Sequence, residues 1–184
     1  MPKTLVIHPK DPSTKFLEPI YKSIKNKKVV SGDYSSTRIR EMIIRYDRVI
    51  MMGHGTSNGL FSVGQFPDQA IYVIDHTFAD LLREKQNSVY IWCNADEFVE
   101  SYKLSGFYTG MFISELNEAF FCDVNGVLDS EIEISNRLFS EIAGRYIHLP
   151  AKAMLEKVKV EYGKIIANNK VAEYNWKRLF AINL

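Results

Sequence analysis

The chain has 184 residues, of which 46% are apolar and 24% charged, a balance typical of one globular domain with a substantial core. Its formal net charge of +1, from 23 basic and 22 acidic residues, predicts neither a nucleic acid nor an anionic membrane as partner. No apolar run approaches the roughly 20 residues of a membrane span, and the first residues lack the apolar stretch of a signal peptide. We therefore expect a single cytoplasmic domain over residues 1–184, with its cysteines as free thiols.

Short apolar runs alternate with amphipathic stretches in the first two thirds of the chain. The expected strands are Thr4–Ile7, Val29–Val30, Val49–Met52, Ser88–Trp92 and Phe107–Ile113. Helices are expected near residues 16–24, after a cap at Ser35 or Ser36, and after a cap at Asp75, with a small hairpin excursion over residues 59–75. This alternation predicts an α/β fold with a mostly parallel sheet and helices on both faces.

The last third is predicted to be helical. Ser114 is expected to cap a helix that runs through Phe121, the motif "SEIE" at 130–133 reads as a capping box, and Gly144 is expected at a helix C-terminus. A helical stripe follows from residue 151 to 166. The tail alternates like a strand at residues 180, 182 and 184, although a helix there stays open.

His54 and Cys93 each follow an apolar run that is predicted to be a strand. Functional sites of parallel sheets form at the carboxyl ends of the strands, so adjacent strands would bring this imidazole and this thiol into one crevice. A thiolate attacks an amide carbonyl when a nearby imidazole accepts its proton, and the imidazolium can later protonate the leaving amine. The N–H groups of Gly55 and Cys93 are the expected donors to the developing oxyanion.

The motif "MMGHG", followed 39 residues after its His by the Cys of "YIWCNAD", resembles the caspase-like (clan CD) cysteine peptidases. The resemblance covers Thr4 to Phe121. It implies a three-layer sandwich with core strand order 2-1-3-4 and a cysteine endopeptidase that needs no cofactor. It also implies that His54 is the general base and acid, that Cys93 is the nucleophile and that Gly55 is an oxyanion-hole residue. The ligand is then a peptide or protein substrate.

The loop after the first strand helps to line the substrate pocket in that family. Here that loop is "HPKDPST", so His8 and Asp11 are predicted substrate-binding residues, together with Asn94 next to the predicted nucleophile. Asp11 favours a basic substrate side chain and Lys10 an acidic one, while Asp11 can equally cap the following helix.

Two alternatives stay open. Trp92 stands where the family usually has a small residue, and Asn94-Ala95-Asp96 replaces a small pair after the Cys, which allows a catalytically inactive caspase-like scaffold that binds a partner protein. In an active site, we expect Trp92 to point into the core, away from Cys93. The loop "GHGTSNG" also allows a doubly wound domain that binds a nucleotide or phosphate.

The remaining cysteine and histidines carry weaker predictions. Cys122 lies in an apolar patch and is expected in the core, whereas His76 and His148 are expected at the surface. These residues lack the spacing of zinc ligands, so no metal is predicted. If His54 activates Cys93, that thiol should alkylate faster than Cys122.

Overall fold

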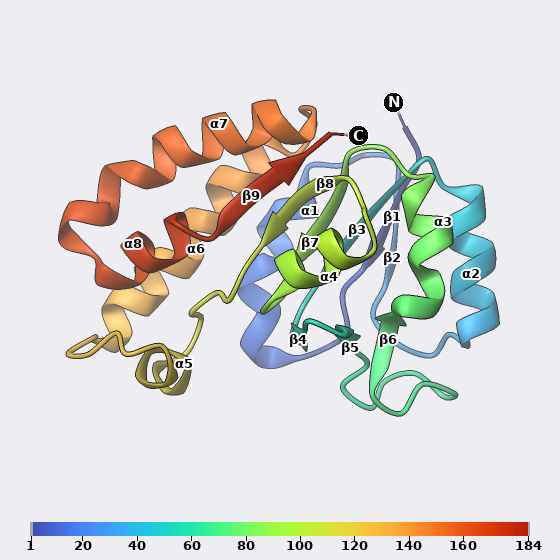
Figure 1. The fold of residues 1–184 in the computed structure, drawn as a ribbon, viewed down its shortest axis with the longest axis horizontal. Helices are drawn as coiled ribbons and strands as arrows, with labels where there is room; N and C mark the ends of the chain where they lie inside the picture. The colour runs from blue at the N-terminus through green and yellow to red at the C-terminus, as the bar shows by residue number, and fades with distance from the viewer. Residues whose placement is uncertain (1, 184) are drawn as a thin grey trace.

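A six-stranded sheet forms the centre of the fold (Figure 1). The structure is a computed structural model that describes residues 2–183. The strand order of the sheet is β2-β1-β3-β7-β8-β9. The strands are β1 (Thr4–Ile7), β2 (Lys27–Val30), β3 (Arg48–Met52), β7 (Ser88–Ile91), β8 (Gly106–Thr109) and β9 (Leu179–Ile182). The first five are parallel to one another and β9 is antiparallel to β8. The predicted α/β class with a mostly parallel sheet is confirmed.

The expected strand order agrees with the observed sheet in part. The runs predicted as strands two, one, three and four are neighbours in that order, as β2, β1, β3 and β7. The sheet then continues through β8 to β9. The sequence pattern allowed either a strand or a helix in the tail that contains β9.

Helices cover both faces of the sheet because its central strands are apolar on both sides. Every residue of β1 and β3 is buried; Leu5 and Ile7 point into one core while Val6 points into the other. One face carries α2 (Ser36–Arg45), α3 (Ala79–Arg83) and α4 (Ala95–Ser101). The other carries α1 (Glu18–Lys22), α6 (Asp129–Tyr146), α7 (Ala151–Tyr162) and α8 (Lys170–Trp176).

The excursion after β3 is a second sheet with three antiparallel strands, one strand more than the predicted hairpin. It contains β4 (Gly55–Thr56), β5 (Gly59–Phe61) and β6 (Tyr72–Asp75). Figure 1 shows β4 and β5 near the carboxyl ends of the parallel strands. Asp75 caps the following 3₁₀ helix η2 (His76–Phe78) and Ser35 caps α2, as predicted. Two further 3₁₀ helices are η1 (Pro12–Leu17) and η3 (Gly163–Asn168).

Several predicted boundaries are wrong. The fifth strand ends at Thr109, and α5 (Leu116–Phe121) begins after Glu115 and not after Ser114. Helix α6 begins at Asp129, so the predicted capping box at 130–133 lies inside the helix. At the start of the helix, the side chain of Glu131 accepts the backbone N–H of Leu128 at 3.0 Å.

Gly144 does not end a helix as predicted. It is buried inside α6, where an added Cβ would lie 2.5 Å from the carbonyl oxygen of Pro19. Its role is therefore close packing of α6 against α1. The predicted core residue Cys122 is half-buried, and the tail is a strand up to Ile182, while Leu184 lies outside the described residues.

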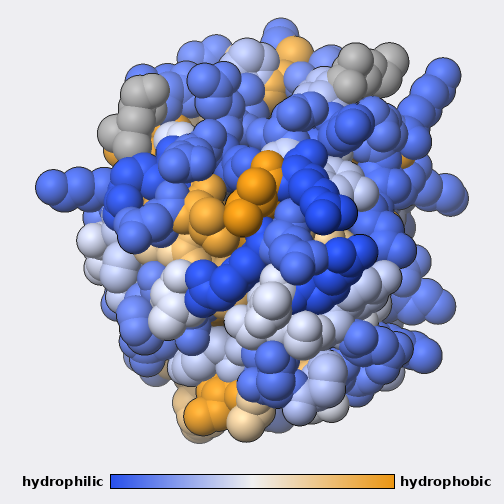
Figure 2. Space-filling model, turned by 90° about the vertical axis from the view of Figure 1, so that its right-hand side faces the viewer, coloured by the Kyte–Doolittle hydropathy of each residue, from blue (hydrophilic) through white to orange (hydrophobic). Residues whose placement is uncertain are grey.

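The surface over α2 and α3 is mostly hydrophilic, with small separate apolar areas (Figure 2). Ile44 on α2 and Ile71 before β6 are each 62% exposed. Across residues 2–183, no helix has both the length and the apolar character required to cross a membrane.

Candidate active site

The ends of β3 and β7 bring His54 and Cys93 to the same edge of the sheet. The two strands pair directly, with Met52 opposite Ile91, and the N–H of Gly53 donates to the carbonyl of Ile91 at 3.0 Å. His54 and Cys93 line one cavity of about 20 Å³. Its other lining residues are Thr14, Phe16, Leu17, Gly53, Ile91, Trp92, Phe112 and Ser114.

The His54 ring hydrogen-bonds to Ser13 and not to Cys93. Its Nε2 lies 2.6 Å from the Ser13 Oγ. Asp11 caps η1 and its Oδ1 accepts both the backbone N–H of Ser13, at 2.9 Å, and the Ser13 hydroxyl, at 2.8 Å. Burial alone would raise the pKa of Asp11, but the hydrogen bonds from Ser13 and the nearby His54 lower it below its ordinary value. The carboxylate is therefore ionised at neutral pH.

Sequence reasoning missed Ser13. The available signal is the "DPS" motif, in which an Asp followed by Pro and Ser is typical of a helix N-terminus. That motif predicts the cap but does not indicate that the serine meets a histidine 41 residues further along the chain.

Cys93 is a protonated thiol in this arrangement. Its Sγ lies 3.6 Å from the carbonyl oxygen of Phe112 and 3.8 Å from Oε1 of Glu118. Burial, and next the negative charge of Glu118, raise the pKa of the Cys93 thiol to about 12. A thiol that stays protonated at neutral pH is a poor nucleophile.

Glu118 also organises the loop that leads into α5. Its Oε2 accepts the backbone N–H and the hydroxyl of Ser114, at 2.7 and 2.9 Å, and the N–H of Glu115 at 3.1 Å. It lies in the first turn of α5, where an acidic side chain is favourable. Sequence reasoning missed Glu118, because a Glu in a first helical turn does not by itself indicate a contact with a cysteine 25 residues earlier.

The cavity is too small for a substrate. A volume of about 20 Å³ holds roughly one water molecule. A peptide therefore does not fit this cavity in the conformation of the structure.

Gly55 is required for the packing of Trp92. A Cβ on Gly55 would lie 2.4 Å from both the Gly59 carbonyl oxygen and the Trp92 ring. Trp92 is 1% exposed, belongs to the core beneath α2, α3 and α4, and donates its Nε1–H to the carbonyl of Thr56 at 3.0 Å. The prediction that Trp92 points into the core is confirmed, and packing alone accounts for the glycine.

No family model matches the chain, and no curated protein matches it either. Within residues 2–183, no three His, Cys, Asp or Glu side chains gather as metal ligands would.

The predicted substrate-binding residues do not lie in the small cavity. His8 and Asp11 line a pocket of about 600 Å³ beside η1, which also includes Lys10 and Lys15. The His8 ring hydrogen-bonds to the hydroxyls of Tyr21 and Thr14, each at 3.1 Å. Burial lowers the pKa of His8 to about 4, so it is neutral at neutral pH.

Asn94 lies between Cys93 and the first residue of α4. It adopts the left-handed backbone conformation, with φ of 62°, at the N-cap of α4, and its side chain makes no capping hydrogen bond. It lines neither of the two pockets just described.

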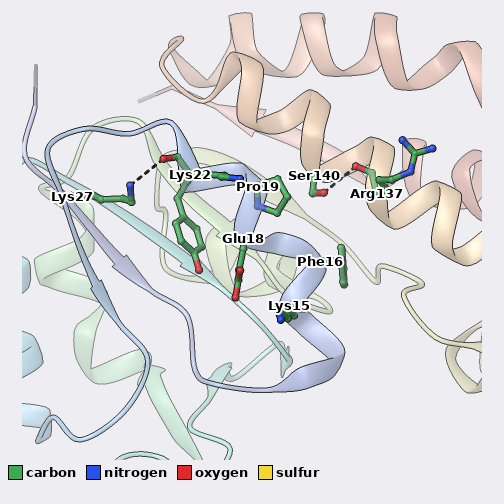
Figure 3. A pocket seen from close by; sticks show the side chains of 9 residues that line it. Lys15, Phe16, Glu18, Pro19, Lys22, Lys27, Arg137 and Ser140 are labelled. Atoms are coloured by element: carbon green, nitrogen blue, oxygen red, sulfur yellow. Dashed lines mark hydrogen bonds between the residues drawn. The ribbon is translucent and has the colours of Figure 1, made fainter.

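A further pocket of about 460 Å³ lies between the η1–α1 segment and α6 (Figure 3). None of the predicted site residues lines it. Basic side chains predominate there, but the Nζ of Lys27 already donates to the carbonyls of Lys22 and Ile24, and Arg137 pairs with Glu141 at 3.5 Å. The side chains of Lys27 and Arg137 are therefore already paired within the chain.

Proposed function

We propose that the chain is a caspase-like cysteine endopeptidase in which Cys93 is the nucleophile and His54 the general base and acid. One observation carries the proposal: His54 and Cys93 follow adjacent parallel strands and line a single cavity at their carboxyl ends. In sheets of this kind, that edge is where functional sites form.

The proposed reaction uses only these two side chains and water. The Cys93 S–H bond breaks and its proton passes to His54, while the thiolate forms a C–S bond to the substrate carbonyl carbon. The carbonyl π electrons move to the oxygen, where the N–H groups of Gly55 and Cys93 are the proposed donors. The C–N bond then breaks, and the amine leaves with the proton from His54. Water hydrolyses the thioester and restores the thiol.

The conformation described is then a closed resting state. Burial and the charge of Glu118 keep the Cys93 thiol protonated, and the cavity beside the thiol is too small for a peptide. Substrate, or another binding event, has to widen this cavity before the reaction begins.

The pocket of about 600 Å³ beside η1 is the proposed site for the substrate side chain that precedes the cut. The ionised carboxylate of Asp11 at its wall favours Arg or Lys. Lys10 and Lys15, on the same wall, favour an acidic residue. Substrates that differ only at this position distinguish the two.

A second candidate is an inactive scaffold with the same fold. The raised pKa of the Cys93 thiol favours it, because a thiol that stays buried and protonated cannot attack an amide.

The test is hydrolysis of a fluorogenic peptide library by the wild-type chain and by Glu118→Gln, which removes the charge next to the thiol. We expect hydrolysis that is faster in Glu118→Gln, is lost in Cys93→Ala and His54→Ala, and is retained in Cys122→Ala. Hydrolysis that persists in Cys93→Ala contradicts the proposal. No hydrolysis by either the wild type or Glu118→Gln leaves the scaffold as the better description.

A further inference from the structure

The Ser13 hydroxyl lies between a carboxylate and an imidazole. It is 2.8 Å from Oδ1 of Asp11 and 2.6 Å from Nε2 of His54, and all three side chains are half-buried. A hydroxyl has one proton to donate and can accept with its lone pairs, so it can donate to only one of these neighbours.

The carboxylate decides the direction of both hydrogen bonds. An ionised Asp11 can only accept, and its Oδ1 already receives the Ser13 N–H. The Ser13 hydroxyl therefore donates to Asp11, because a charged acceptor makes the stronger hydrogen bond. Its oxygen then accepts from His54, so Nε2 of His54 carries a hydrogen.

The same arrangement occurs elsewhere in the chain with an unambiguous donor. Asp75 caps η2, and its Oδ1 accepts both the N–H and the hydroxyl of Thr77, at 2.9 and 2.6 Å. The Thr77 hydroxyl oxygen lies 2.5 Å from an Nη of Arg40, and a guanidinium can only donate. The Thr77 hydroxyl therefore donates to its Asp and accepts from the third group, which is the role inferred for Ser13.

We propose that Asp11 and Ser13 are positioning residues that hold Nε2 of His54 as a donor, so that Nδ1 is the nitrogen that accepts the Cys93 proton. The Nδ1 atom has no hydrogen-bond partner among the side chains and backbone groups of residues 2–183, whereas Nε2 is occupied. The inference rests on the proposed function in naming Cys93 as the proton source. The assignment of the His54 tautomer is independent of that function.

The first test is a direct measurement of the His54 tautomer by NMR on protein labelled with ¹⁵N in its four histidines. We expect hydrogen on Nε2 of neutral His54 in the wild type. In Asp11→Ala the Ser13 hydroxyl loses its carboxylate acceptor and donates to Nε2, so hydrogen moves to Nδ1. Removing that hydroxyl as well, in Asp11→Ala/Ser13→Ala, should reverse the change.

Two further variants separate this effect from damage to the helix cap. Asp11→Asn keeps a capping oxygen but removes the charge that decides the direction of the hydrogen bonds, so hydrogen should again move to Nδ1 although the helix cap is retained. Asp75→Ala removes the equivalent cap of η2 and should leave His54 unchanged. Hydrogen on Nδ1 in the wild type, or an unchanged tautomer in Asp11→Ala, overturns the inference.

The second test measures alkylation of Cys93 in a Glu118→Gln/Cys122→Ser background. Adding Asp11→Ala should slow it about tenfold, less than the roughly 10²–10⁴ that a positioned base contributes to catalysis. Adding Ser13→Ala to that variant should restore most of the rate. Equal rates in all three proteins overturn the inference even if the tautomer behaves as expected. Peptide hydrolysis by Glu118→Gln tests the proposed function separately, so either idea can fail alone.

Discussion

Replacing Glu118 with Gln should activate the Cys93 thiol. The thiol's pKa is raised from 9.0 to about 12, so at pH 7 its thiolate fraction is about a thousandfold lower than that of an ordinary cysteine. Burial is the larger cause and the Glu118 charge the next. Gln has nearly the same shape as Glu, so the substitution removes the charge and leaves most of the burial.

The expected gain follows from the 3.8 Å between the Cys93 Sγ and Glu118 Oε1. Two charges at about 4 Å repel by about 1 kcal/mol in water and about 4 kcal/mol at an effective dielectric constant of about 20. These energies correspond to pKa changes of about 0.7 and about 3. Burial is the larger cause of the raised pKa, so the charge accounts for at most about half of the rise, a pKa change of about 0.7 to about 1.5. Because a less basic thiolate is also less nucleophilic, with a Brønsted coefficient of about 0.4–0.5, alkylation should accelerate between about twofold and about eightfold.

The assay is the iodoacetamide alkylation rate of Cys93 in a Cys122→Ser background, followed by mass spectrometry between pH 7 and 9. Glu115→Gln is the matched control, because it removes an exposed charge three residues away. Ser114→Ala loosens the same loop without removing the charge, and loosening alone should change the rate by a similar factor at every pH. A Glu118→Gln rate equal to that of Glu115→Gln would refute the electrostatic reasoning.

Three further predictions concern stability. Burial lowers the pKa of His8 from 6.5 to about 4 in the folded chain, so acidification protonates the unfolded chain first and favours unfolding. Between pH 7.5 and 4.5 this should lower the free energy of unfolding by about 2–3 kcal/mol, and urea denaturation of His8→Gln should show a correspondingly weaker pH dependence. Gly144→Ala should cost about 1–3 kcal/mol in thermal unfolding, because its Cβ meets the Pro19 carbonyl; an unchanged melting temperature would contradict that packing. Trp92→Phe removes the N–H that donates to the Thr56 carbonyl, so the free energy of unfolding should fall by at least about 1–3 kcal/mol in chemical denaturation. An unchanged free energy of unfolding would mean that water solvates this carbonyl freely.

The sequence by itself determined the local elements near the candidate site. Apolar runs at residues 49–52 and 88–91 predict buried strands because a parallel strand covered on both faces has no polar side. Ser35 and Asp75 predict helix starts because their side chains satisfy backbone N–H groups only a few residues away. These signals are local, so no knowledge of distant contacts is needed to interpret them.

Tertiary structure alone decided which polar atoms meet. The pairing of β3 with β7 brings His54 and Cys93 to one cavity, yet their polar partners are Ser13 and Glu118. A serine in a cap motif and a glutamate in a first helical turn each have a sufficient local explanation, so neither pattern indicates a second contact across the fold. The protonation of the Cys93 thiol was equally hidden, because it depends on burial and on a charge 25 residues away, and both exist only once β7, β8 and α5 have packed together.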